Sequence, residues 1–504
     1  MNNKQKSILN IGTSIFSQIV ILVFGLIVPR IILVHYGSDT NGLTSTISQI
    51  FTYMALLQSG ISQAARNALY KPIKDDDKQE ISFYLSAARR YYRKISRWYL
   101  LAVIALALIV PLILKTEIGY WTVAFYVFFE GLVSVVSFYF INTWTCFLNA
   151  KGDVYIVTAI TLFNQVLCYL VKIVLSIMGM NIALIQVGYF AVSLLQLAIY
   201  YLYMRKKYGW INYNEAPKGA KLPDRSAYIV TEVAWTMFSS TDMIVLSIFV
   251  STSLASVYSV YNMVFVALNG LLNAVYNAVN YNLGRTYVED IEKYKKVHDL
   301  FHSFFMSCMT ILMCVAYLLI IPFVRLYTAG VEDINYIYPL LPVFFCLTQL
   351  LSWSRYIAGN LINVAGRIKT VLKVSIAEAL INVVLSVILV QFLDITGVLF
   401  GTVAALPLKV VCCNYIADIK ILHRSIWKTV SVLLLNYGIF AVTVIVNLYL
   451  DISVSSYLYF ILMGVLLTVI YSVVVFAANM VVNRDILRVV KVLFARRRNK
   501  QSGI

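Results

Sequence analysis

The sequence predicts an all-α polytopic membrane protein with about fourteen transmembrane helices, and two observations support this prediction. Hydrophobic residues make up 61% of the 504 residues and charged residues only 13%, whereas soluble domains average about 25% charged residues. Apolar runs of about 20 residues or more, long enough to cross a hydrocarbon core of about 30 Å, recur along the chain. Backbone groups in lipid must bond within their own segment, and the runs are too long for barrel strands, so each run is expected to form a helix.

The apolar runs alone set the bounds of the expected helices. The first run follows Lys4 and Lys6, as the apolar part of a signal peptide would. It is too long for a signal peptide and lacks a small-residue cleavage site, so we expect a membrane helix that is retained. The expected spans are 8–34, 43–70, 97–114, 120–148, 154–178, 182–204, 226–250, 254–283, 298–326, 334–363, 371–393, 397–420, 428–449 and 457–480.

Lysine and arginine residues orient these spans. With the amino terminus inside, 34 of the 41 basic residues fall in inner segments, and only Lys115 and Arg325 fall in outer loops. This asymmetry predicts that both termini and the longest inner loops, 71–97 and 205–225, are cytoplasmic. It also accounts for the net charge of +18 without a nucleic-acid partner. The tail RVVKVLFARRRNK is expected to anchor at an anionic bilayer surface, where each basic residue contributes about 1 kcal/mol.

The connecting loops are short, so any chemistry must take place inside the helix bundle. The sequence has neither a G-x-x-x-x-G-K-[ST] phosphate loop nor a G-x-S-x-G elbow, which disfavours ATP hydrolysis and serine-hydrolase catalysis. The seven cysteines lie in apolar runs without a C-x-x-C pair, as buried hydrophobic residues would. His298 and His302 can share a helix face, but no carboxylate completes an H-E-x-x-H zinc motif. We therefore predict no catalytic residues, no cofactor and no metal.

Two landmarks recur along the sequence with nearly one offset. The turns NAKGD (149–153) and NVAGR (363–367) are 214 residues apart, and the segments 29–43 and 242–256 are 213 residues apart. The shared offset indicates duplication of a six-span unit. Because six is even, both copies would have the same orientation and be related by an axis along the membrane normal. The predicted domains are an N-lobe at 1–210, a C-lobe at 211–425, and a helix pair with a basic tail at 426–504.

Charged residues inside the spans are the candidate functional residues. A charge at midspan costs about 2.5–3.5 kcal/mol even on lenient insertion scales, so such residues should face protein or water. Arg66 and Glu232 lie close enough to a span end to reach the interface instead. For the deeper residues, the alternatives are a cavity that binds cargo or a coupling ion, or an ion pair inside one lobe. The charged residues singled out as candidates inside spans are Arg30, Arg66, Glu130, Lys172, Glu232, Asp242, Arg355, Glu378 and Lys409.

Pro29 and Arg30 stand side by side near the outer end of the first span. A proline frees a backbone carbonyl and bends a helix, which suits a residue that lines a cavity. We therefore expect Pro29 to turn Arg30 into a cleft. Pro407 stands two residues before Lys409 and repeats this pairing of a proline with a cation.

Taken together, these features resemble the MOP flippase superfamily (the MATE/MOP-like fold), and specifically the Wzx-type polysaccharide transporters. The resemblance covers nearly the whole chain and rests on PRIILVHYGSDTNGL, GISQAARNALY, STDMIVLSIFVSTSLASVYSVYNM and the two NAKGD and NVAGR turns. It implies that undecaprenyl-diphosphate-linked oligosaccharide repeat units are moved from the inner to the outer leaflet by alternating access, for surface or capsular polysaccharide assembly. It further implies a bacterial cytoplasmic membrane location and makes a polysaccharide polymerase a candidate partner.

The resemblance also implies site residues. Family members hold the diphosphate with cations in a central cavity; that role passes to Arg30 and Arg66 by motif, and to Arg355 and Lys409 by depth only. Asp242 matches an acidic position of the family in the seventh span. Asp242 and Glu378 are assigned either to ion coupling or to a structural ion pair, and coupling to Na⁺ or H⁺ stays open. Arg30 departs from the family pattern, because it lies nearer the outer end than a midplane clamp would.

Two other function classes remain open. A multidrug or metabolite exporter of the same superfamily would share the core, but it would need acidic residues for cationic cargo, and the first span has none. A membrane polysaccharide polymerase or glycosyltransferase would be expected to carry a large outer loop, which this sequence lacks. The excess of cations inside the spans favours an anionic cargo.

Overall fold

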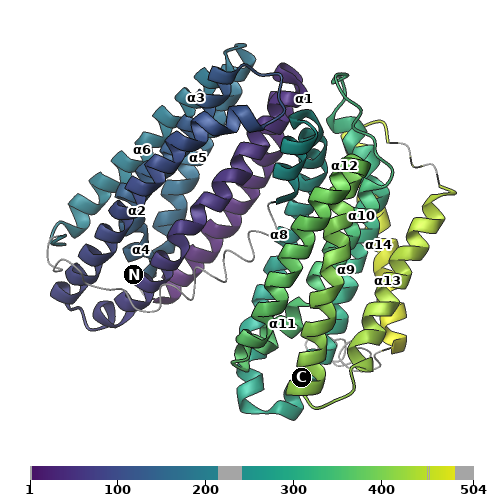
Figure 1. Cartoon of the computed structure of the whole chain (residues 1–504). Coiled ribbons are helices and arrows are strands. Elements are labelled where there is room, and N and C mark those ends of the chain that lie inside the picture. Colours follow the sequence, from purple (N-terminus) through teal and green to yellow (C-terminus); the bar gives the residue numbers. More distant parts are fainter. Residues whose placement is uncertain (1–2, 214–240, 451, 453, 483–504) are drawn as a thin grey trace, which may run out of the picture. The chain divides into compact units, whose positions relative to one another are not determined.

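The computed structural model describes residues 3–213, 241–450, 452 and 454–482, and every regular element in this part of the chain is a helix (Figure 1). The all-α prediction is therefore confirmed, and ten helical segments are long and apolar enough to cross a membrane. The elements are α1 (Asn3–Lys74), α2 (Lys78–Ile113), α3 (Tyr120–Val136), the π-helix η1 (Ser137–Ile141), α4 (Asn142–Ala150), α5 (Val154–Ile177), α6 (Ile182–Tyr208), α8 (Thr252–Glu289), α9 (Ile291–Tyr327), α10 (Leu341–Trp353), α11 (Tyr356–Val364), α12 (Ile368–Tyr415), the π-helix η2 (Ile416–Ile421), α13 (Trp427–Asn447) and α14 (Tyr457–Val482).

The ten segments agree with about fourteen spans once their breaks are considered. Both α1 and α12 contain two predicted spans, because their backbones leave helical dihedrals at Gly37 and Asp394. The predicted span 334–363 is divided between α10 and α11. Most of the predicted span 226–250 lies outside the described residues, and its last part, 241–249, is helical.

The break in α1 is at Gly37, which has φ 79° and ψ 180°. A continuous helix of this length would extend about 108 Å at 1.5 Å per residue, so the chain must break to remain within a bilayer. Asp333 caps the second half of α1, because both the Ser38 N–H and the Ser38 hydroxyl donate to its carboxylate at 2.6 Å. This break lies inside the predicted turn between the spans 8–34 and 43–70, and glycine readily takes its positive φ. Pro29, where the first span was expected to bend, keeps helical dihedrals.

The predicted inner loop 71–97 is mostly helix. The α1 helix ends at Lys74, and α2 begins at Lys78 after an Asp77 cap whose side chain accepts from two backbone N–H groups. This segment is charged but amphipathic, and its buried face includes Ile81 and Tyr92. The apolar-run criterion missed this part of the helix because it detects lipid-facing surface, whereas tertiary packing stabilises the rest.

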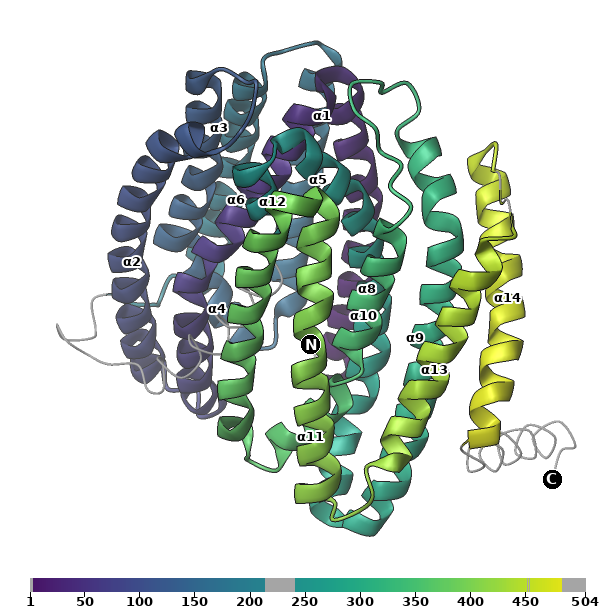
Figure 2. The ribbon, with the colours of Figure 1, turned by 45° about the vertical axis from the view of Figure 1, so that its right-hand side comes forward.

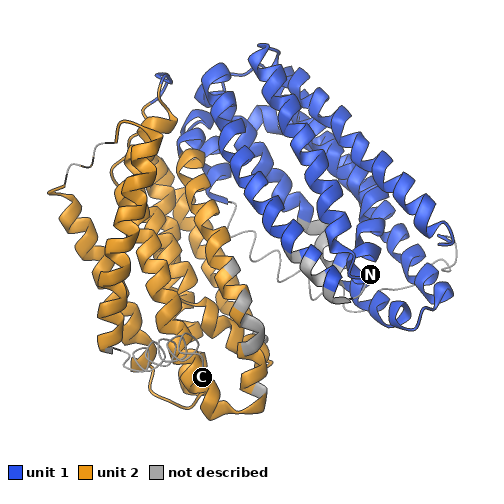
Figure 3. Cartoon of the chain, turned by 180° about the vertical axis from the view of Figure 1, so that it is seen from behind, with its two compact units in different colours: residues 1–257, 330–334 blue, residues 258–329, 335–504 orange. Residues whose placement is uncertain are grey.

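The chain forms two compact units (Figure 3): unit 1 comprises residues 1–257 and 330–334, and unit 2 comprises 258–329 and 335–504. In unit 1, α1 packs on α2 and α5, and α3 packs on α2 and α6. In unit 2, α9 packs on α10, α13 and α14 (Figure 2). The predicted lobe boundary at 210/211 adjoins 214–240, which lie outside the described residues, so the domain division stays a prediction.

The two predicted repeat turns have matching backbones. Gly152 and Gly366 are both left-handed, with φ 77° and 70°. Each glycine N–H donates at 3.1 Å to the carbonyl of an asparagine three residues earlier, Asn149 or Asn363. The residue after each glycine closes a wider turn at 2.9 Å in both copies. Both helices therefore end in the same C-terminal motif at the predicted offset.

Helix starts repeat as well. Asp77 begins α2 and Asp290 begins α9, and each carboxylate accepts from the N–H groups two and three residues later. The two helices contain 36 and 37 residues. These matched caps, like the matched turns, agree with duplication of a six-helix unit.

Contacts within unit 1 define its two ends. At one end Lys6 pairs with Asp153 at 2.5 Å, beside the NAKGD turn. At the other end Asp39 accepts from the Thr116 hydroxyl at 2.7 Å and from the Glu117 N–H at 2.9 Å. The orientation of these two ends relative to the membrane stays a prediction.

We expect Glu332→Cys to react with a membrane-impermeant maleimide in intact cells, and Lys78→Cys to react only after permeabilisation, because positive-inside topology places residue 78 in the cytoplasm. Both residues are exposed. The parent protein is the negative control, because its seven cysteines are buried or half-buried and should not react. Asp39 is unsuitable for labelling because its carboxylate is hydrogen-bonded, and Lys221 and Asp451 lie outside the described residues. Labelling of residue 78 alone in intact cells would overturn the orientation.

Candidate functional site

Three of the predicted site residues meet in the interior of unit 2. Arg355 lies between α10 and α11, and Glu378 and Lys409 lie in the two halves of α12. One Glu378 carboxylate oxygen accepts from the Arg355 guanidinium. The other is 3.4 Å from Lys409 Nζ. The sequence placed Arg355 and Glu378 toward the cytoplasmic side of their spans and Lys409 near the middle of its span. The structure brings the three residues into one cluster, which we call the cation cluster.

The cation cluster contains two cations and one carboxylate. The side chains of Arg355 and Glu378 are 4% and 2% exposed, whereas that of Lys409 is 19% exposed. Burial at membrane depth is costly for each charge, and the shared carboxylate carries the charge to compensate for one of the two cations. The Arg355–Glu378 contact matches the predicted alternative of a structural ion pair. Lys409 is the most accessible member of the cluster and the one best placed to meet a ligand.

Aromatic residues hold the break that carries Arg355. Trp353 is the last residue of α10, and its indole N–H donates to the Asn269 side-chain oxygen at 2.8 Å. The Trp353 and Tyr356 rings lie 4.1 Å apart between centroids. The Tyr276 hydroxyl donates to the Tyr356 carbonyl at 3.4 Å. The tyrosines at this break are therefore engaged in packing within unit 2.

Arg66 lines a polar cavity in unit 1. The cavity has a volume of about 320 Å³ and lies between the second half of α1 and α4. Hydroxyl and amide side chains make up most of its wall, so it offers hydrogen-bond donors and acceptors beside one guanidinium. The adjacent π-helix is a type of irregularity that often marks functional sites. The lining residues are Ala55, Ser62, Arg66, Asn142, Thr145, Cys146 and Asn149.

The remaining predicted residues also belong to unit 1. Arg30 is half-buried in the first half of α1, and it does not line the Arg66 cavity. Asp242 is buried in the helical stretch 241–249. The adjacent Thr241 hydroxyl lies 2.5 Å from the Tyr53 hydroxyl of α1. Arg30, Arg66 and Asp242 thus belong to unit 1, whereas the cation cluster belongs to unit 2.

Two further membrane charges have partners within unit 1. The Gln186 side-chain amide donates to the Glu130 carboxylate. The Lys172 ammonium lies over the ring of Tyr189, 4.1 Å from its centroid, which is a favourable cation–π geometry. These contacts support structural roles for Glu130 and Lys172. The candidate Glu232 lies outside the described residues.

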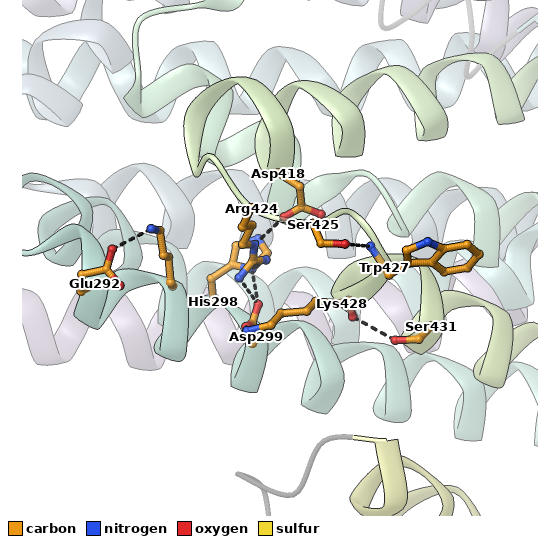
Figure 4. Close-up of polar contacts among 10 residues, drawn as sticks. Glu292, His298, Asp299, Asp418, Arg424, Ser425, Trp427, Lys428 and Ser431 are labelled. Carbon is orange, nitrogen blue, oxygen red and sulfur yellow. Dashed lines mark hydrogen bonds and ion pairs between the residues drawn. The ribbon is translucent and has the colours of Figure 1, made fainter.

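Sequence reasoning missed a charged network in unit 2 (Figure 4). Arg424 lies 2.5 Å from the Asp299 carboxylate and 2.8 Å from that of Asp418. His298 Nδ1 lies 3.3 Å from Asp299 and 3.2 Å from the Arg424 guanidinium. Lys428 approaches Asp299 at 4.0 Å. One arginine shared by two carboxylates thereby ties the connection between η2 and α13 to α9.

His298 and His302 share a helix face, as their spacing predicts. Their rings stack with centroids 6.0 Å apart and planes at 4°. The charged network occurs at the ends of the predicted spans 298–326 and 397–420, and sequence reasoning did not single out Asp299, Asp418 or Arg424 as candidates. The alternation of acidic and basic residues around the ends of spans 9 and 12 was the available signal. The polar wall of the Arg66 cavity had a clearer signal in the sequence, because Asn142 and Thr145 interrupt an apolar run.

Solved structures of transporters share this fold. The lipid II flippase MurJ, in an inward closed conformation, matches with a TM-score of 0.69 and 15% identity, covering 95% of this chain and 100% of the MurJ chain. A multidrug resistance MATE family transporter of the MOP superfamily, inward-facing, matches with a TM-score of 0.62 and 14% identity over 84% of this chain and 95% of that chain. The MATE multidrug transporter DinF-BH, solved as a ligand complex, matches with a TM-score of 0.56 and 15% identity over 83% and 97%.

No protein-family model matches this sequence, and no curated protein matches it. The likeness is therefore one of architecture, and it extends over nearly all of both chains. The chain is a multi-pass helical membrane protein with the fold common to the MurJ flippase and the MATE transporters of the MOP superfamily.

Proposed function

We propose that this protein flips undecaprenyl-diphosphate-linked oligosaccharide repeat units from the inner to the outer leaflet by alternating access, for surface polysaccharide assembly. The observation that carries the proposal is the cation cluster, in which Arg355 and Lys409 share the single carboxylate of Glu378. A site with surplus positive charge at membrane depth is suited to an anionic ligand. A diphosphate is the anionic part of such a lipid-linked sugar.

The Arg66 cavity adds a second cationic site, in unit 1. A guanidinium can bind phosphate through two parallel hydrogen bonds, a geometry that an ammonium lacks. Hydroxyl and amide groups beside it can bond to phosphate oxygens or sugar hydroxyls. We assign diphosphate contact to Arg66 and Lys409, and retain Arg30 as a candidate near the outer exit. In this assignment Arg355 acts by orienting Glu378, and Asp242 is a charge partner or a coupling-ion ligand.

Export of cationic drugs is the main competing function, because MATE transporters share the fold. A cationic cargo would need accessible carboxylates. Glu378 is 2% exposed and is already engaged by two cations, so it is poorly suited to attract a third. The charge of the cluster therefore favours the lipid-linked sugar over the drug.

The two functions are separated by a binding measurement on purified full-length protein. We expect undecaprenyl-diphosphate oligosaccharide to bind, and a cationic rhodamine dye to bind far more weakly. Binding of the lipid should weaken about tenfold or more in Lys409→Met, which removes one charge-assisted contact, and less in Lys409→Arg. Tight binding of the dye with no binding of the lipid would favour the drug-exporter alternative and refute the proposal.

A further inference from the structure

The break between α10 and α11 is held by a residue of α13. The Ser354 hydroxyl donates to the Leu350 carbonyl at 2.6 Å, and it lies 2.7 Å from the Tyr437 hydroxyl. A hydroxyl has one proton, so Tyr437 must be the donor in the second contact. Ser354 is 2% exposed, which leaves it few other partners. A serine that bonds to the preceding turn in this way bends a helix.

Asn414 of α12 holds the same residue from another side. Its side-chain amide donates to the Ser354 carbonyl at 3.2 Å and to the Val410 carbonyl at 2.9 Å. In a continuous helix the Ser354 carbonyl would accept from a backbone N–H four residues later. The contact with Asn414 therefore satisfies a carbonyl at the point where α10 gives way to α11.

The residue after this break is Arg355, so its geometry fixes where the guanidinium points. Arg355 pairs with Glu378, and Glu378 contacts Lys409. Lys409 and Asn414 belong to the same half of α12. A path of direct contacts thus leads from Tyr437 through the break to the cation cluster.

Apolar packing keeps α13 in this register. Val432 and Leu433 of α13 are buried against Met306 of α9 and Val410 of α12. Tyr437 packs on the same small core. Because close-packed side chains resist sliding, a shift of α13 along α9 would remove Tyr437 from Ser354.

We propose that Tyr437 is a positioning residue for the cation cluster, and hence that the added pair α13–α14 takes part in building the binding site. Its hydroxyl keeps Ser354 at the break, which holds Arg355 on Glu378 and leaves Lys409 available for ligand. This inference rests on the proposed function of the cluster.

The test uses purified full-length Tyr437→Phe, which removes the hydroxyl and keeps the ring. The matched control is Thr443→Val, which removes another α13 hydroxyl, one that lies 3.0 Å from the Ile439 carbonyl and 3.4 Å from Cys314 Sγ, without touching the break. Two quantities are measured: the affinity for undecaprenyl diphosphate, and amide hydrogen exchange over residues 350–360. We expect Tyr437→Phe to weaken binding roughly fivefold and to speed exchange in that segment, with both unchanged in Thr443→Val.

The outcomes separate this inference from the function on which it rests. If Lys409→Met weakens binding but Tyr437→Phe binds as the parent does, the positioning role is wrong and the proposed function stands. If Lys409→Met also binds as the parent does, the cluster is not the diphosphate site and the proposed function fails there. Amide hydrogen exchange over residues 350–360 then decides alone whether Tyr437 positions the break. Faster exchange confined to Tyr437→Phe would then support the positioning of the break, and unchanged or equally faster exchange in both variants would overturn it.

Discussion

Glu378→Gln is expected to destabilise unit 2 by about 3–5 kcal/mol, because it leaves the buried Arg355 and the half-buried Lys409 beside a neutral amide. The carboxylate contacts both Arg355 and Lys409, so both lose their shared counter-charge at once. The amide keeps the size and one acceptor oxygen, so loss of charge is the main change. The measurement is thermal unfolding of the purified protein in detergent, where we expect a midpoint roughly 5–10 °C lower.

A second substitution tests whether charge imbalance is the cause. Adding Lys409→Met to Glu378→Gln removes one of the two cations, and it should restore part of the lost midpoint. The control is Glu332→Gln, an exposed carboxylate whose loss should leave the midpoint unchanged. A Glu378→Gln protein that unfolds with the parent would show that Glu378 does not hold the two cations. A double variant less stable than Glu378→Gln alone would exclude repulsion as the cause.

The fold was predictable to the extent that lipid dictates it. Apolar runs located the helices because lipid-facing surface must be apolar, and the NAKGD and NVAGR turns marked the repeat because each contains a left-handed glycine. The division of α1 at Gly37 falls inside the predicted turn between the spans 8–34 and 43–70. The bend expected at Pro29 within the first span does not interrupt the helix, because the fixed φ of proline is compatible with a helix.

The sequence predicted how deep the candidate charged residues lie in the membrane, but not which of them meet. The sequence places Arg355 and Glu378 at similar levels of neighbouring spans, but the direction of each side chain depends on helix rotation, which tertiary packing sets. Contacts such as Tyr437 with Ser354 join residues 83 positions apart, and neither residue is unusual enough in sequence to indicate a partner. The same holds for Arg424, which lies in the connection between η2 and α13, whereas its partner Asp299 is on α9.

Arg66→Ala is expected to weaken binding of undecaprenyl diphosphate by about tenfold to a hundredfold, because it removes a guanidinium from a cavity otherwise lined by neutral side chains. Arg66→Lys should lose less, since it keeps the charge and gives up only the two-pronged geometry. In cells, the alanine variant should accumulate lipid-linked glycan in the inner leaflet. The measurements are affinity, and surface polysaccharide per unit of membrane-inserted protein.

The matched control for Arg66 comes from the same cavity wall. Thr145 donates its hydroxyl locally to the Asn142 carbonyl at 3.1 Å, so Thr145→Val changes the wall with little change in charge and should affect binding weakly. If Thr145→Val weakens binding as much as Arg66→Ala, the cavity depends on shape and the guanidinium has no special part in it. If Arg66→Ala binds and exports as well as the parent, Arg66 is an interfacial residue whose charge reaches the bilayer surface. The diphosphate contact would then have to lie with Lys409 or Arg30, and the Arg30→Ala variant would decide between them.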